Sequence, residues 1–126
     1  MPFRARLVRP EDVADPFHDG DTIWLEYDHG KFIHVPTDIR LKDVHAPELK
    51  PLQLGAAETR QFVIDWIAQW NVGKWPFWVD SWRTSTYRDA KTLDRFLGEV
   101  FNRDRSSCLN IAVQTFVDEH GYPAGN

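Results

Sequence analysis

The sequence is short of cysteine, short of positive charge and without a long apolar run. A single cysteine, Cys108, excludes an internal disulfide, and its apolar helical surroundings favour a buried structural thiol. A net charge of −4 argues against a protein that binds nucleic acid by general electrostatic attraction. The N-terminal residues contain no apolar stretch of the length that a signal peptide or membrane span needs, so we expect a cytoplasmic protein with no membrane partner.

The composition is that of one folded domain. A chain of 126 residues is long enough to bury a core without disulfides, and no repeat, linker or low-complexity segment divides it. Its hydrophobic fraction of 42% and charged fraction of 27% are typical of globular proteins. We therefore expect a single domain over residues 1–126, with the six tryptophans used mainly in packing.

The hydrophobic pattern predicts five strands and two helices. Runs of β-branched and aromatic residues bounded by Gly, Pro and Asp predict strands at Phe3–Val8, Asp21–Tyr27, Phe32–Val44, Trp75–Trp82 and Phe96–Phe101. Apolar residues at helical spacing predict helices at Gly55–Trp70 and from Ser106 or Ser107 to His120. The segments expected to be loops are Pro10–His18 and Arg83–Asp94.

This order of elements predicts an α+β fold that is mainly β. Five strands, with one helix between the third and fourth and a second helix at the C-terminus, are the arrangement of a five-stranded OB-type barrel. In the third strand, alternation places four residues toward the core: Ile33, Val35, Ile39 and Leu41.

Two short motifs carry charged residues at the predicted strand ends. The first is His18-Asp19-Gly20-Asp21-Thr22, and the second runs from Ile39 to Leu49 and includes Arg40 and Glu48. Carboxylates that converge from two strands suit a hard divalent cation, which prefers oxygen ligands. A guanidinium group binds phosphate oxygens through paired hydrogen bonds and stabilises charge that develops on them.

Together these motifs resemble the staphylococcal nuclease-like (thermonuclease) family. Asp-Gly-Asp-Thr followed by Arg-Leu-x-x-Val-x-x-Pro-Glu is similar to two motifs of that family, and Arg95 before the fifth strand is similar to its third. The extended segment 28–40 resembles the longer hairpin of compact intracellular or phage-borne members, and Leu109-Asn110 with the following helix resembles the last shared element.

The resemblance implies a role for each matching position. Asp21 would be a calcium ligand with Asp19 in support, and Glu48 would orient the attacking water. Arg40 and Arg95 would grip the scissile phosphate.

One metal position departs from the family pattern, because His45 stands where the second carboxylate is expected and Ala46 follows it. Imidazole suits a softer metal than calcium, which brings manganese or zinc into consideration. Other acids that would replace the missing carboxylate are Asp43, two residues before His45 along the strand, and the loop residues Asp12 and Asp15. Leu93 and Asp94 replace the tyrosine and glycine that precede the last arginine in the family.

The same residues also have purely structural interpretations. Asp19-Gly20-Asp21 is an ordinary turn sequence, and Glu48 beside Pro47 suits the first turn of a helix. The remaining charged residues would then form ion pairs or face solvent: Arg40 with Glu48, Arg95 with Glu99, and Tyr87, Arg88 and Lys91 in a solvated loop.

The sequence therefore predicts a monomeric, metal-dependent nuclease that hydrolyses phosphodiester bonds of DNA or RNA, with metal ligands Asp19, Asp21 and His45. Two alternatives stay open. One is a catalytically degenerate OB-fold module that binds nucleic acid or protein. The other is a structural or assembly protein, for example of a phage particle, which a patch of exposed tryptophans such as Trp75 or Trp78 would favour.

Overall fold

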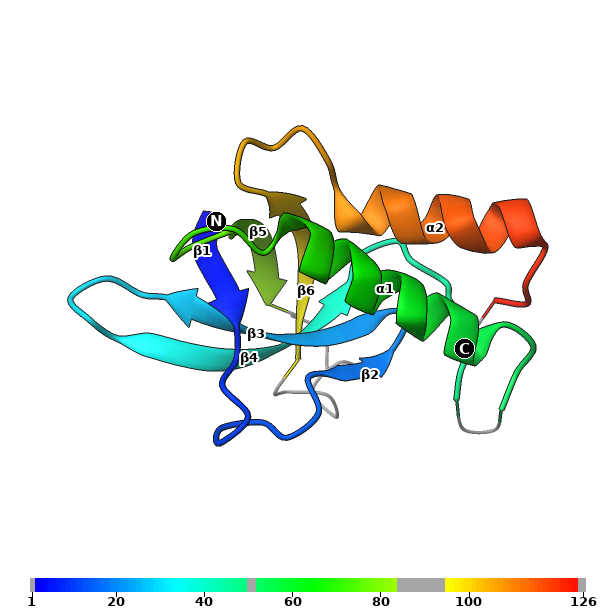
Figure 1. The fold of residues 1–126 in the computed structure, drawn as a ribbon, viewed down its shortest axis with the longest axis horizontal. Coiled ribbons are helices and arrows are strands. Elements are labelled where there is room, and N and C mark those ends of the chain that lie inside the picture. The colour runs from blue at the N-terminus through cyan, green and yellow to red at the C-terminus, as the bar shows by residue number, and fades with distance from the viewer. Residues whose placement is uncertain (1, 50–51, 84–94, 125–126) are drawn as a thin grey trace.

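The structure is a computed structural model that describes residues 2–49, 52–83 and 95–124. It contains six strands and two helices (Figure 1), which in chain order are β1 Pro2–Leu7, β2 Phe17–Asp19, β3 Thr22–Asp28, β4 His34–Leu41, α1 Ala56–Trp70, β5 Phe77–Arg83, β6 Arg95–Asn102 and α2 Leu109–His120. Most of the predicted loop Arg83–Asp94, including Tyr87, Arg88, Lys91 and Leu93, lies outside the described residues.

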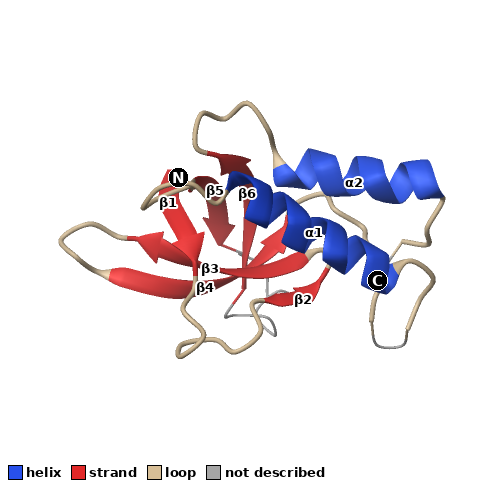
Figure 2. Ribbon diagram, in the orientation of Figure 1, coloured by secondary structure: helices blue, strands red, loops and turns tan. Residues whose placement is uncertain are grey.

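The strands form one sheet in the order β1-β5-β6-β4-β3-β2, and a further pairing between β1 and β3 closes a ring of five strands. All neighbours are antiparallel except β4 and β6, which run parallel. Figure 2 shows the two helices lying together on one side of the strands. The prediction of an α+β, mainly β fold is confirmed at this level.

Strand β2 was not predicted, because its segment was expected to be a loop. Phe17 pairs with Ile23 and Asp19 with Thr22, so the chain turns tightly through Gly20 to pair with β3. A strand of three residues is too short to show alternation of apolar and polar side chains, which is the signal that identifies strands in a sequence.

The predicted inner face of the third strand is right at one end and wrong at the other. Ile39 and Leu41 are fully buried, whereas Ile33 is 54% exposed and Val35 is 40% exposed. The β3–β4 hairpin extends beyond the ring (Figure 1), and β1 pairs with β3 only up to Tyr27. Alternation fixes which side chains share a face but does not show where the covering layer ends.

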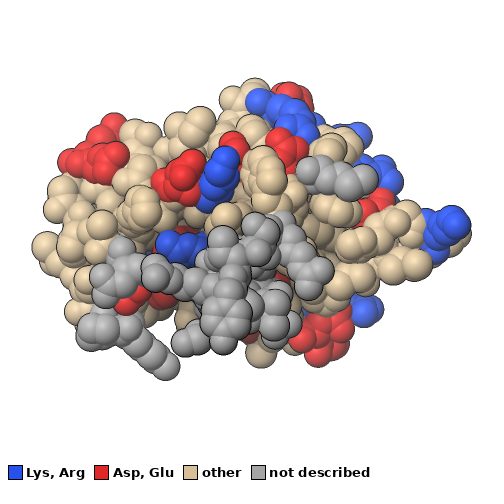
Figure 3. All heavy atoms as spheres, turned by 180° about the vertical axis from the view of Figure 1, so that it is seen from behind, with Lys and Arg blue, Asp and Glu red and all other residues tan. Residues whose placement is uncertain are grey.

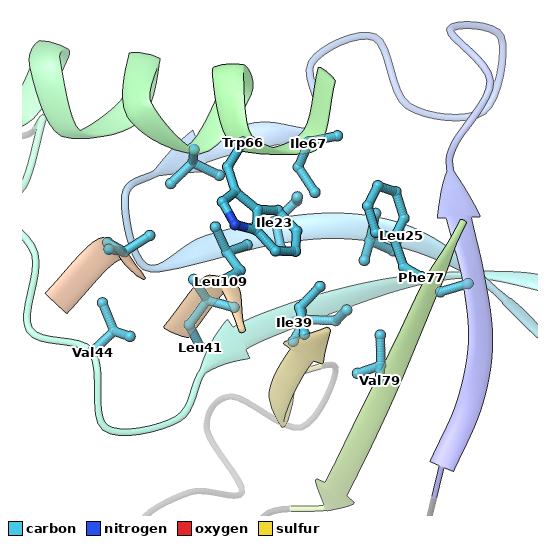
Figure 4. Packing of buried hydrophobic residues seen from close by; sticks show 14 of the residues in the cluster. Ile23, Leu25, Ile39, Leu41, Val44, Trp66, Ile67, Phe77, Val79 and Leu109 are labelled. Atoms are coloured by element: carbon cyan, nitrogen blue, oxygen red, sulfur yellow. The ribbon is translucent and has the colours of Figure 1, made fainter. Parts of the chain in front are cut away.

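The core lies between the ring and the two helices. Trp66 and Ile67 of α1 point toward the strands, where the Trp66 ring stacks on Phe77 with a centroid distance of 6.0 Å (Figure 4). Among the apolar residues whose spacing predicts the two helices, Val63, Trp66 and Ile67 in α1 and Leu109, Val113 and Val117 in α2 are buried.

Asn110, near the start of α2, fastens this helix to the parallel strand pair. Its side-chain amide donates to the carbonyl oxygens of Lys42 and Gly98 at 3.0 and 2.8 Å, and its Oδ1 accepts from the Val100 N–H at 3.0 Å. Cys108 is the residue that precedes α2 and is only half-buried, so the prediction of a buried thiol within the helix is wrong. Burial still raises the pKa of this thiol.

In the described part of the chain, neither helix has the length and apolar character needed to cross a membrane.

Candidate functional site

A cleft of about 660 Å³ opens where β2, the start of β3, the end of β4 and the first turns of α1 meet. Seven residues of the two sequence motifs line it, and four of these are candidate site residues, namely Asp19, Asp21, Arg40 and Glu48. The remaining lining residues are Asp15, His18, Thr22, Leu49, Ala57, Arg60 and Gln61. Residues up to 29 positions apart in the motifs are thus gathered in one cleft.

Gly20 holds the Asp-Gly-Asp turn against α1. A Cβ atom at this position would lie 2.4 Å from Cγ2 of Thr59 and 3.1 Å from Cβ of Ala46. No side chain fits there, so the backbone of the turn packs directly on the helix. The flanking carboxylates of Asp19 and Asp21 are brought to the cleft by this close approach.

Asp21 is a buried carboxylate with two partners. Its Oδ1 accepts from the Thr22 hydroxyl at 3.1 Å, and its Oδ2 lies 3.3 Å from Nη1 of Arg40. Burial raises the pKa of Asp21 and the charge of Asp19 adds to the rise, while Arg40 and Thr22 oppose it. The carboxylate is therefore kept at an energetic cost that the neighbouring cation only partly offsets.

Arg40 reaches the cleft from β4, directly opposite Thr22 of β3. Its side chain is 31% exposed, and the guanidinium has further N–H groups beyond the one that contacts Asp21. The ion pair in the structure is thus with Asp21, whereas the structural interpretation of the sequence paired Arg40 with Glu48.

Glu48 lines the cleft from the segment between β4 and α1, where it is hydrogen-bonded to Gln53. The Glu48 N–H donates to Oε1 of Gln53 at 2.8 Å, and the Gln53 N–H donates to the Glu48 carbonyl at 2.9 Å. Glu48 precedes α1 by several residues, so it is not an acid of a helical first turn. Nearby, the Leu49 N–H donates to Oδ1 of Asp19 at 3.2 Å and ties this segment to the Asp-Gly-Asp turn.

Arg95 begins β6, where its backbone is paired with Asp38 of the parallel strand β4. Asp38 is two residues before Arg40, so the register brings the backbone of Arg95 close to the strand that carries Arg40.

The structure does not bring His45 into the cleft. Its side chain is exposed, and its backbone N–H donates to Oε1 of Gln114 in α2 at 2.8 Å. β4 ends at Leu41, and Asp43 follows with a φ of 60°, so the two residues are not on one strand face as predicted. Asp43 instead lines a separate cleft beside α2.

Of the two loop acids predicted as replacement ligands, Asp12 and Asp15, one lines the cleft and the other does not. Asp12 lies 3.2 Å from Nε of Arg9, outside the cleft. Asp15 lines the cleft, where both of its carboxylate oxygens are 3.1 Å from Nη2 of Arg60.

Sequence reasoning missed Arg60, which also donates from Nε to the carbonyl of Phe17 at 2.8 Å. Arg60 thereby joins α1 to β2 and to the loop before it. Its position on the polar side of the predicted helix was the only available signal, and that signal does not distinguish a cleft residue from a solvated one.

The lining of the cleft carries more negative than positive charge. Four carboxylates, those of Asp15, Asp19, Asp21 and Glu48, face two guanidinium groups, those of Arg40 and Arg60, which gives −4 + 2 = −2 with His18 neutral. Acidic and basic groups are also interspersed over the face shown in Figure 3. Among the described residues, no group of three or more His, Cys, Asp or Glu side chains is arranged to hold a metal ion.

In comparisons with protein families, with curated proteins and with solved structures, nothing matches this chain.

Proposed function

We propose that this chain is a staphylococcal nuclease-like phosphodiesterase that hydrolyses DNA or RNA in the cleft of Asp21, Arg40 and Glu48. The observation that carries the proposal is that these three residues, from three separate segments, line the same cleft. The closed ring of five strands and its single parallel pair support an OB-type barrel as the scaffold.

The donor set of the cleft fits a hard divalent cation. Asp19 and Asp21 supply carboxylate oxygens, and a cation such as magnesium or manganese is commonly held by one or two carboxylates together with water and substrate phosphate. A bound divalent cation would neutralise the formal charge of −2 on the lining and would attract the phosphate. His45 lies outside the cleft, so ligation by its imidazole gains no support from the geometry. The imidazole in the cleft is that of His18, whose Nε2 lies 4.0 Å from Oδ2 of Asp19.

The residues of the cleft would divide the reaction between them. Arg40 donates N–H groups to the phosphate oxygens, where negative charge grows as water attacks phosphorus. Glu48 accepts the proton of that water, so that the new P–O bond forms as the bond to the leaving oxygen breaks. The leaving oxygen then takes up a proton from solvent.

A non-catalytic module is the second candidate, and one observation favours it. Arg40 is already paired with Asp21, so the cation that would bind phosphate and the acid that would bind metal neutralise each other in this structure. In a module that only binds nucleic acid or protein, this pair would be a permanent structural contact.

The test is degradation of fluorescent single-stranded DNA and RNA in the presence of magnesium, manganese, calcium or zinc. We expect cleavage, and we expect Glu48→Gln to lower the rate at least about 100-fold, because general-base catalysis is typically worth that much. Glu11→Gln is the matched control, since Glu11 is 73% exposed and outside the cleft. Absence of cleavage by the wild-type protein with all four cations would leave the non-catalytic module.

A further inference from the structure

Another cleft, of about 400 Å³ and called the second cleft from here on, lies beyond the C-terminal end of α1. Its lining residues combine three cations with two indole rings: Arg4, Lys74, Arg103, Trp75 and Trp78. This lining contains no carboxylate, which contrasts with the acidic cleft described above. A concentration of positive charge on a chain of net charge −4 is a local feature and not a consequence of composition.

Residues from three neighbouring strands lie side by side next to this cleft. Arg4 of β1 is paired with Trp78 of β5, which is paired with Phe101 of β6. Arg105, from the loop after β6, covers the Phe101 ring at 4.8 Å and the Trp78 ring at 5.6 Å. Figure 1 shows the start of β1, the loop after α1 and the loop after β6 at the same end of the molecule.

The indole of Trp75 is held in position by its neighbours. The Arg6 guanidinium lies 4.4 Å from the ring centroid, and the His34 ring meets Trp75 edge-on at 5.0 Å. Trp75 and Trp78 are both half-buried, so each ring is anchored in the protein and still reaches the cleft. Two fixed aromatic rings beside cations are the usual elements of a site that stacks nucleobases.

Two of the cations are available for a ligand. Arg4 lies 2.7 Å from Asp28, and Arg105 lies 3.2 Å from Asp80, so both of these charges are compensated. Lys74 and Arg103 are exposed, and within the described residues neither has an ion-pair partner. Arg103 extends over Gly73, where an added Cβ would lie 3.2 Å from its Nη1, so its guanidinium lies close to the residue that precedes Lys74.

We infer that this second cleft binds a single strand of nucleic acid, with bases stacked on Trp75 and Trp78 and phosphates contacted by Lys74 and Arg103. The inference rests on the proposed function for the class of substrate. A lipid surface fits less well, because half-buried indoles in a concave site cannot insert into a bilayer. An acidic peptide would use the cations but has no planar base to stack on the indole rings.

The position of the second cleft suits a role in holding the substrate strand. Ala57, Arg60 and Gln61 of the first cleft lie near the start of α1, and Lys74 of the second follows its end. A helix of 15 residues spans about 22 Å, so the two clefts are separated by roughly that length of the protein. A strand held at the basic cleft would supply the affinity that the acidic cleft lacks.

The test measures binding of fluorescent oligothymidylates of about 4 to 16 nucleotides, the range that OB-type domains occupy. It is done in EDTA, so that cleavage does not interfere. We expect Lys74→Glu/Arg103→Glu to weaken binding at least about ten-fold, and to lower the slope of log Kd against log salt by about 1.4, which corresponds to two phosphate contacts. The matched control is Arg9→Glu/Lys31→Glu, which changes the charge equally at exposed positions outside both clefts.

A second probe tests stacking without altering the protein. An abasic strand of equal length is expected to bind roughly ten-fold more weakly than oligothymidylate, because it has phosphates but no bases. The inference is overturned if the abasic strand binds equally well, if the two double variants lose the same affinity, or if polyglutamate or phosphatidylserine vesicles bind more tightly than the oligonucleotide.

The outcome for this cleft is separable from the outcome for the nuclease. Binding in EDTA that is lost in Lys74→Glu/Arg103→Glu supports the second cleft even if no cation supports cleavage. Cleavage of long strands with an unchanged KM in the same variant would refute the second cleft alone. The expected result for an active enzyme is a raised KM on long strands with little change in kcat.

Discussion

Substitution of Gly20 by alanine tests whether the Asp-Gly-Asp turn is held by its close approach to α1. The added Cβ would lie 2.4 Å from Cγ2 of Thr59, well inside van der Waals contact. Such overpacking typically costs about 2 kcal/mol. With an unfolding entropy of about 2.1 cal/mol/K per residue, 126 residues give roughly 0.26 kcal/mol/K, so the expected fall in Tm is about 8 °C.

A double-mutant cycle identifies the contact responsible. Thr59→Ser removes the methyl group that clashes and keeps the hydroxyl, which donates to the Gly55 carbonyl at 2.7 Å. Alone it should cost about 1 kcal/mol, the usual loss for a buried methyl group. With the methyl absent, the added Cβ still lies 3.1 Å from Cβ of Ala46 and 3.2 Å from Cβ of Thr59, so part of the cost remains. We expect the double variant to lose about 2 kcal/mol, whereas additivity would give about 3 kcal/mol, which corresponds to a coupling of about 1 kcal/mol.

The assay is urea denaturation followed by circular dichroism and tryptophan fluorescence for the four proteins of the cycle. Additivity of the two substitutions would refute the reasoning, because it would mean that the Gly20 Cβ and the Thr59 methyl do not meet. Since Asp19 and Asp21 flank Gly20, the proposed nuclease activity should also fall in Gly20→Ala and recover in the double variant.

Two further predictions concern buried polar groups. Burial raises the pKa of Asp21 in the folded protein, so the folded protein binds this proton more tightly than the unfolded chain does. The free energy of unfolding therefore falls as the pH rises from the unfolded pKa of about 3.9 through the raised folded pKa. The loss of stability persists at neutral pH. Asp21→Asn should therefore stabilise the protein at neutral pH and flatten this decline in denaturation curves, and a loss of stability at neutral pH would show that the Arg40 pair outweighs burial. Asn110→Ala removes three hydrogen bonds to groups of Lys42, Gly98 and Val100 and should cost about 3 kcal/mol in urea denaturation, whereas a cost under about 1 kcal/mol would mean that water replaces the amide.

The helices and the strands of the ring were predictable because each is long enough for its spacing of apolar residues to repeat several times. The buried residues of α1 and α2 are those at helical spacing. β2 was not predictable, since its pairing with β3 depends on the turn at Gly20 and on Arg60, which donates to the Phe17 carbonyl from another element. A tertiary contact of this kind leaves no periodic mark in the sequence.

The residues of the candidate site also fall into a group that was predictable and a group that was not. Asp19, Asp21, Arg40 and Glu48 stand in short motifs at strand ends, and all four line the cleft. The interpretation of Asp43 and His45 assumed that the strand continues to Val44. The strand ends at Leu41, and the left-handed conformation of Asp43 turns the chain away, so strand alternation no longer relates these side chains.

Under the proposed function, the two clefts would reconcile an acidic chain with a polyanionic substrate. The lining of the first carries a formal charge of −2, so a phosphate entering it without a cation meets repulsion that burial strengthens. The lining of the second carries three cations, two of them without ion-pair partners in the described part of the chain. Affinity for the strand and chemistry on the phosphate would then reside at opposite ends of α1. Added salt would weaken the affinity for the strand, because that affinity acts through exposed charges. It would have less effect on the partly buried Asp21–Arg40 pair.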